Sequence, residues 1–206
     1  MKSACFFLLL FFFLATGINA QDEIMKDANV ESDLPYYQIP PYPETYTAGT
    51  VAARLIDGLG FRYYWATEGL RPEDLQFRPN EAARTTEETL DHIYELSILI
   101  VNAPQHEPNQ RTQENTAFTF EQKRRQTLAN FKTASDLLKA SEDKDMAGHN
   151  LIFQRGNETS EYPFWNLING PIADALWHVG QVVSFRRSSG NPFNPKVSVF
   201  SGKVRD

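Results

Sequence analysis

An acidic residue and a histidine four positions apart form the part of this chain best suited to chemistry. Asp174 and His178 follow the helix-start signal Asn169-Gly170-Pro171. On a helix, a spacing of four places two side chains on one face, one turn apart, so both can reach the same small object. Imidazole nitrogens and carboxylate oxygens are both ligands for zinc, iron and nickel. The spacing therefore predicts part of a metal site.

A histidine from another segment, His92, is expected to complete that site. It lies beside the apolar stripe of its predicted helix, and Val182 follows His178 by one turn, so both histidines should face the interior. We expect His92, Asp174 and His178 to be ligands of a divalent metal, either zinc, nickel or iron. The alternative is a metal-free interior in which Asp174 accepts a hydrogen bond that orients His178 or a nearby arginine.

Two polar residues one helical turn from the histidines are the predicted catalytic residues. Glu95 follows His92 by three positions, and Gln181 follows His178 by three, so each can reach the same site. We expect them to position a nucleophile. A solvated helix face would explain Glu95 almost as well, and Glu95 is also an alternative ligand.

Four segments with helical periodicity must bring these residues together. Two of them begin with a capping box, a hydroxyl residue followed three positions later by Glu or Gln. These starts are Thr85 with Glu88 and Thr119 with Gln122. The predicted helices cover about 48–67, 85–104, 119–140 and 169–189. Little strand signal competes with them, so the sequence predicts an all-α four-helix bundle over residues 47–192.

The segments between the predicted helices also have expected structures. The polar stretch 102–117 is long enough to cross the length of a bundle, and the segment between the third and fourth helices predicts a short hairpin or an ordered loop. His106 and His149 fall in predicted loops and are expected to be exposed. The first helix is indicated by apolar residues at fourfold spacing, namely Val51, Leu55, Leu59 and Tyr63.

The flanking segments predict an exported protein. Residues 1–20 combine a basic start, a short apolar run and small exit residues, which is typical of a secretory signal peptide. Residues 21–46 are rich in proline and tyrosine and predict an extended arm, and 193–206 form a C-terminal tail. Loss of Lys2 with the signal peptide shifts the net charge from -6 to -7. This charge argues against nucleic acid or an anionic membrane as a partner, and no membrane anchor is expected.

The motifs together resemble the DinB/YfiT-like superfamily. The resemblance covers nearly all of 47–192 and rests on Phe77-Arg78-Pro79, Leu90-Asp91-His92-Ile93, Trp177-His178-Val179-Gly180-Gln181, Arg186-Arg187 and Gly190-Asn191-Pro192. It implies a bundle with up-down-down-up order and a divalent metal on three histidines. His92 and His178 match two of those histidines, while Asp174 stands where the family has the third.

The activities that the resemblance implies are thiol transfer and amide hydrolysis. We therefore expect a metal-dependent hydrolase or transferase with a small-molecule substrate, and the resemblance also implies a homodimer. The alternative is a non-catalytic helical bundle that binds a small ligand or a protein partner through aromatic side chains. The candidates for such a surface are Tyr63, Tyr64, Trp65, Phe164, Trp165 and Trp177.

Overall fold

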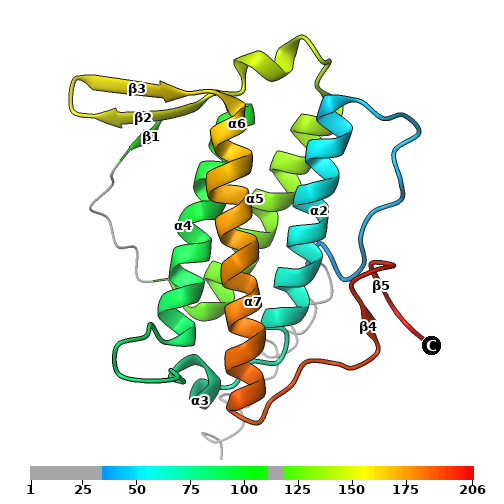
Figure 1. Ribbon diagram of the computed structural model, residues 1–206, viewed down its shortest axis with the longest axis vertical. Coiled ribbons are helices and arrows are strands. Elements are labelled where there is room, and N and C mark those ends of the chain that lie inside the picture. The colour runs from blue at the N-terminus through cyan, green and yellow to red at the C-terminus, as the bar shows by residue number, and fades with distance from the viewer. Residues whose placement is uncertain (1–33, 111–117) are drawn as a thin grey trace, which may run out of the picture. The chain divides into compact units, whose positions relative to one another are not determined.

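The computed structural model describes residues 34–110 and 118–206. The predicted signal peptide, the first half of the arm and residues 111–117 lie outside the described residues. Within them, the helices of sixteen residues or more are α2 (Ala48–Thr67), α4 (Thr86–Gln105), α5 (Phe120–Ala140) and α7 (Ala173–Ser188). The chain runs in one direction along α2 and α7 and in the opposite direction along α4 and α5 (Figure 1).

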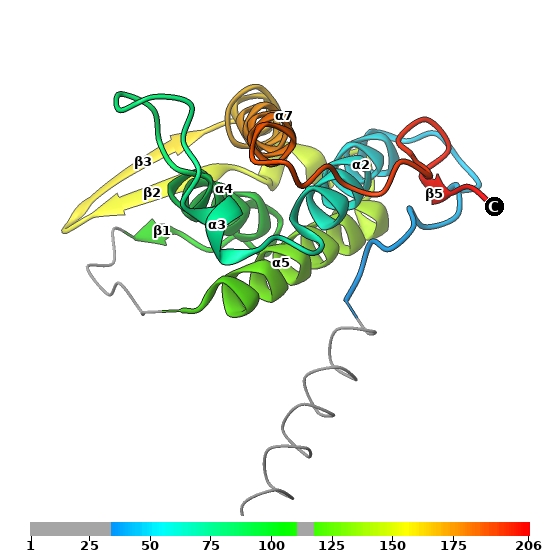
Figure 2. The same cartoon turned by 90° about the horizontal axis from the view of Figure 1, so that it is seen from below.

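The long helices pack around a shared apolar core. α2 and α4 each pack against both α5 and α7, and α5 and α7 lie on opposite sides of that pair (Figure 2). Fully buried side chains from all four helices fill the space between them: Ile56, Leu59, Tyr63, Ile93, Ile100, Leu128, Phe131, Leu138 and Val182. None of the described helices combines the length and the apolarity that a membrane-spanning segment requires.

The predicted helix starts at Thr85 and Thr119 are confirmed. The Thr85 hydroxyl accepts from the Glu88 backbone N–H at 3.1 Å, and the Glu88 carboxylate accepts from the Thr85 N–H at 2.7 Å. Thr119 and Gln122 form the same reciprocal pair at the start of α5. These bonds satisfy N–H groups that a helix start leaves without partners. They fix where α4 begins, and with it the direction in which His92 points.

The last long helix begins earlier than predicted. Its first turn, α6 (Phe164–Leu167), follows Pro163 and leads through a π-helical turn, η2 (Ile168–Ile172), directly into α7. Asn169 and Pro171 therefore lie inside a helix and not at its start. A proline has no N–H and clashes with the preceding turn of an α-helix, and the wider π-helical turn accommodates it. This turn sets the rotation of α7 just before Asp174.

The buried face of α2 differs from the apolar series at fourfold spacing. Val51 and Leu55 are each 50% exposed, whereas Ile56, Leu59 and Tyr63 are buried. Four residues advance a helix by about 40° more than a full turn, so a strict fourfold series drifts off one face. The apolar series therefore coincides with the buried face at Leu59 and Tyr63 and leaves it at Val51 and Leu55.

The prediction of an all-α fold is wrong, because the described residues also form two small sheets. β2 (Leu151–Arg155) and β3 (Glu158–Tyr162) form an antiparallel hairpin, and β1 (Asn109–Gln110) pairs in parallel with β2. β4 (Val197–Ser198) and β5 (Lys203–Val204) pair within the predicted tail. Strands of two residues are too short to show alternation, and β3 is exposed along its whole length. The fold is therefore mixed α/β.

The second half of the arm packs against α2. The Tyr36 hydroxyl donates to Asp57 Oδ1 at 3.1 Å, and a Cβ on Gly60 would lie only 2.5 Å from the Tyr36 ring. The Trp65 indole N–H donates to the Tyr37 carbonyl at 3.1 Å. Burial and the neighbouring Asp57 raise the pKa of Tyr36 above its ordinary value. Two short helical turns complete the fold: α3 (Pro72–Leu75) and η1 (Asp145–Gly148).

Candidate metal centre

The three predicted metal ligands meet between α4 and α7. His92 Nε2 lies 3.2 Å from Asp174 Oδ2, and His178 Nε2 lies 3.3 Å from Asp174 Oδ1. One ligand atom from each residue lies within 4.8 Å of the others, and the two imidazole rings meet edge to face. Within residues 34–110 and 118–206, this is the only group of three or more acidic, histidine or cysteine side chains arranged in this way.

The separations between these atoms fit ligands of one small cation. Zinc takes bonds of about 2.0 to 2.1 Å to nitrogen and oxygen in a tetrahedral arrangement, which places neighbouring ligand atoms about 3.3 Å apart. The two nitrogen–oxygen separations of 3.2 and 3.3 Å are close to that value, although they involve different oxygens of Asp174. One ligand atom of each residue lies within 4.8 Å of the others, so small side-chain movements would let all three bind one divalent transition metal.

Each ligand lies at the edge of the core next to a buried neighbour. Ile93 and Ala175 are completely buried, and Val179 is 2% exposed. These neighbours hold the two helices in register, while the ligands remain accessible: the exposed fraction of the side chain is 15% for His178, 26% for His92 and 43% for Asp174. An ion held here would therefore have one side open to a small molecule from solution.

Gln181 and Glu95 contact the far sides of the histidine rings. Gln181 Oε1 lies 2.7 Å from His178 Nδ1, and Glu95 Oε2 lies 3.7 Å from His92 Nδ1. Polar groups in this position orient an imidazole and fix which of its nitrogens carries the proton. The geometry therefore suits a positioning role for both residues, and their predicted role beside a nucleophile stays a prediction.

The hydrogen bonds of the site depend on which ring nitrogen of each histidine carries the proton. His92 Nε2 lies within hydrogen-bond distance of Asp174 Oδ2, and His178 Nδ1 lies within hydrogen-bond distance of Gln181 Oε1. With its proton on Nδ1, His178 donates to Gln181 and keeps a lone pair on Nε2 that a metal ion can bind. The 3.7 Å between Glu95 Oε2 and His92 Nδ1 is longer than a hydrogen bond.

The remaining two histidines lie together away from this site. His106 is exposed as predicted, but His149 is only 4% exposed, and the prediction of an exposed loop residue is wrong. The His149 ring lies 5.2 Å from that of His106, and its Nε2 is 2.8 Å from Ser141 Oγ. Its Nδ1 has no hydrogen-bond partner within the part of the chain that the structure describes. Burial and the neighbouring His106 lower the pKa of His149.

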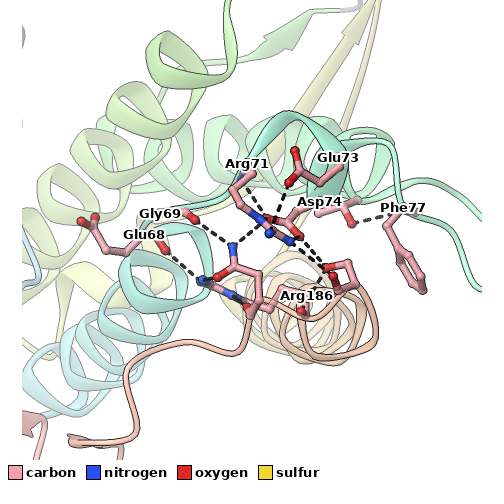
Figure 3. Close-up of polar contacts among 10 residues, drawn as sticks. Glu68, Gly69, Arg71, Glu73, Asp74, Phe77 and Arg186 are labelled. Carbon is pink, nitrogen blue, oxygen red and sulfur yellow. Dashed lines mark hydrogen bonds and ion pairs between the residues drawn. The ribbon is translucent and has the colours of Figure 1, made fainter.

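A second carboxylate is surrounded by hydrogen-bond donors near the C-terminal end of α7 (Figure 3). The side chain of Asp74 is completely buried and accepts from Arg71 Nε and Nη2, both at 2.9 Å. It also accepts from Ser189 Oγ at 2.5 Å and from Asn191 Nδ2 at 2.6 Å. These hydrogen bonds, that from Arg71 above all, hold the pKa of Asp74 well below its ordinary value. We call Arg71, Asp74, Ser189 and Asn191 the Asp74 cluster.

Arg186 stabilises the neighbouring end of α2. Its Nη1 donates to the carbonyls of Trp65, Ala66 and Glu68 at 3.1, 3.0 and 2.9 Å. The last carbonyls of a helix have no partners within the helix, and a cation there is favourable. Local spacing alone does not reveal the structural roles of Arg186 and the Asp74 cluster, because Arg186 bonds to α2 and Asp74 bonds to Asn191 across more than 110 residues.

The aromatic candidates for a binding surface divide into two groups. Tyr63, Tyr64, Trp65 and Phe164 are buried and belong to the core. Trp165 and Trp177 are 76% and 73% exposed. Only these two members of the set are therefore free to contact a ligand or a partner.

Comparisons with protein-family models, with curated proteins and with solved structures find no match for this chain. Membership of the DinB/YfiT-like superfamily stays a prediction, and the site is therefore interpreted from its own geometry.

Proposed function

We propose that this protein binds a divalent transition metal through His92, Asp174 and His178 and acts on a small molecule as a metal-dependent hydrolase or transferase. The observation that supports this most strongly is the convergence of two imidazoles and one carboxylate from two helices, with one ligand atom of each within 4.8 Å of the others. Both Nε2 atoms lie 3.2 to 3.3 Å from oxygens of Asp174, and Gln181 contacts the other nitrogen of His178. Zinc, nickel and iron all accept this set of two imidazoles and one carboxylate.

The protein's own residues then have separate tasks. Asp174 supplies the negative charge and contacts both histidines, and Gln181 and Glu95 hold the two rings with their Nε2 atoms toward it. A divalent ion in this position supplies Lewis-acid chemistry for hydrolysis or group transfer. The exposed side of Asp174 leaves room for a substrate to approach. Export and a homodimer stay predictions and are not needed for this proposal.

Metal content and metal affinity test the proposal. Protein produced without an affinity tag is stripped with a chelator, and its binding of zinc, nickel and iron(II) is measured by calorimetry and elemental analysis. We expect one ion per chain. His178→Ala should abolish stoichiometric binding, because it removes a ligand and the ring that Gln181 orients.

His106→Ala is the matched control, since it removes an exposed histidine outside the site. It should bind one ion with unchanged affinity. The proposal is overturned if the unsubstituted protein binds none of the three metals, or if His106→Ala loses binding as completely as His178→Ala.

The catalytic half of the proposal has its own test. The metal-loaded protein is assayed against a panel of small amides and esters and against thiol acceptors with low-molecular-weight thiols. Turnover that requires the metal and disappears in His178→Ala is the expected result. Metal binding without turnover on any member of either class would leave the protein a metal-binding protein and contradict the enzymatic function.

A further inference from the structure

We infer that Trp177 is a substrate-contacting residue of the proposed metal centre and that it selects ligands with a flat apolar group next to their metal-binding atoms. This inference rests on the proposed function, because it assigns a ligand preference to the same site. Trp177 is not needed to bind the metal, and the metal ligands alone do not indicate which class of substrate binds.

The exposure of Trp177 is the first observation. A tryptophan is among the side chains that gain most from burial, and the indole of Trp177 is 73% exposed. Among the described residues, the Trp177 side chain makes no ring contact and no hydrogen bond. Tyr64 and Trp65, by contrast, pack against each other and against Tyr37. The large ring of Trp177 therefore contributes little to the fold and is free to contact a ligand.

Its position relative to the ligands is the second observation. Trp177 follows Asp174 by three positions and precedes Gln181 by four on the same helix. Side chains at these spacings are neighbours on the helix surface, with Cβ atoms about 5 to 6 Å apart. Trp177 thus stands on the exposed side of the carboxylate, while the more buried His178 stands on the other side. By this spacing the indole is the large exposed side chain of α7 next to Asp174.

The space around the site gives the third observation. Gly170 lies about one turn before Asp174, and nothing lies within 4 Å of the place where its Cβ would be. No side chain therefore covers the helix one turn before Asp174, and the exposed indole three positions after Asp174 offers an aromatic face to a bound molecule. Such a face favours planar apolar groups, which stack on it or meet it edge to face. We expect the substrate to carry a ring or a similarly flat apolar group a few atoms from the group that binds the metal.

Two chelators that differ in one group test the inference. Acetohydroxamate and benzohydroxamate bind a divalent ion through the same two oxygen atoms, but the first carries a methyl group and the second a phenyl ring. Their affinities for the zinc-loaded protein are measured by calorimetry. An aromatic contact should make benzohydroxamate about two- to tenfold the tighter ligand. Trp177→Ala should remove this preference and leave the affinity for acetohydroxamate unchanged, and Trp177→Phe should keep part of it.

Trp165→Ala is the matched control. Trp165 is equally exposed and lies on the same continuous helical segment, but nine residues before Asp174. Its removal should leave the preference intact. The inference is overturned if Trp177→Ala retains the preference, or if Trp165→Ala loses it to the same extent. If acetohydroxamate does not bind to the zinc-loaded protein, or zinc itself does not bind, the proposed function fails and the inference with it. If both hydroxamates bind equally well to the unsubstituted protein, the inference about Trp177 fails and the proposed metal site is unaffected.

Discussion

Two carboxylates join α7 to the rest of the protein, and their surroundings are opposite. Asp74 is completely buried and accepts hydrogen bonds from nitrogen and hydroxyl donors of Arg71, Ser189 and Asn191. Asp174 is 43% exposed, and its two oxygens face the Nε2 atoms of His92 and His178. In the first case every polar neighbour supplies a hydrogen. In the second, both neighbours are imidazoles, which can either donate a hydrogen bond or bind a metal ion.

This difference separates a structural cluster from a binding site. A buried carboxylate with a full set of donors is stable as it stands and holds elements together. A partly exposed carboxylate beside two imidazoles keeps oxygen lone pairs for a ligand. The two carboxylates therefore differ in burial and in the number of fixed donors around them.

The largest effect is expected when the Asp74 cluster is broken. Asp74→Ala leaves the Arg71 guanidinium and the Ser189 and Asn191 donors without their shared acceptor, and we expect a loss of about 3 kcal/mol in the free energy of unfolding. Urea denaturation measures it. Asp74→Asn keeps the shape and one acceptor oxygen and should lose less. A loss below about 1 kcal/mol in Asp74→Ala would contradict the structural role.

The same cluster predicts a response to acid. The pKa of Asp74 is lower in the folded protein than in the unfolded chain, so its contribution to stability is fully present above about pH 4 and is lost as the pH falls further, toward the folded value. The stability difference between the unsubstituted protein and Asp74→Asn should therefore shrink below pH 4.

The next effect should appear only with metal. Asp174→Asn replaces one acceptor oxygen by a donor, so without metal we expect its free energy of unfolding to stay within about 0.5 kcal/mol of the unsubstituted protein. Zinc at about 100 times the dissociation constant should stabilise the unsubstituted protein by about 2.7 kcal/mol, and Asp174→Asn should gain much less. Urea denaturation with and without zinc measures both. If Asp174→Asn is strongly destabilised without metal, Asp174 is a structural residue like Asp74, and the proposed difference between the two carboxylates is wrong.

A smaller effect separates the two residues behind the histidines. Gln181→Ala should weaken zinc binding about 10- to 100-fold, because the amide that orients His178 is lost. Glu95→Ala should weaken it less, since its carboxylate is 75% exposed and 3.7 Å from His92. Competition with a chelating dye measures both affinities under the same conditions. Equal effects of the two substitutions would show that the short contact at 2.7 Å has no special part in orienting the ring.

The smallest effect concerns the histidine pair outside the metal centre. The pKa of His149 is lower in the folded protein than in the unfolded chain, because burial and His106 disfavour its charged form. Its contribution to stability is therefore present above about pH 6.5 and declines as the pH falls below that value. His149→Gln should reduce the loss of thermal stability between pH 7.5 and 5. An identical pH dependence in the two proteins would contradict the assignment.

Local signals predicted the starts of two long helices and the pair of ligands on the last one. Capping at Thr85 and Thr119 depends on residues three positions apart, and the spacing of Asp174 and His178 is a property of one helix turn. Such interactions leave a readable pattern in the sequence. The strands β1, β4 and β5 are each two residues long, which is too short to show an alternating pattern in the sequence. Their pairing depends on where the fold places them. For the same reason the all-α prediction was wrong.

The sequence by itself determined which residues can bind a metal, because the residue types and their helical spacing are local properties. Only the tertiary structure decided that His92 lies 3.2 Å from Asp174 across 82 positions. It also decided that Asp74 is saturated with donors, through partners up to 117 positions away. Packing between helices sets these contacts, and the direction of each hydrogen bond depends on atoms that a linear pattern does not place.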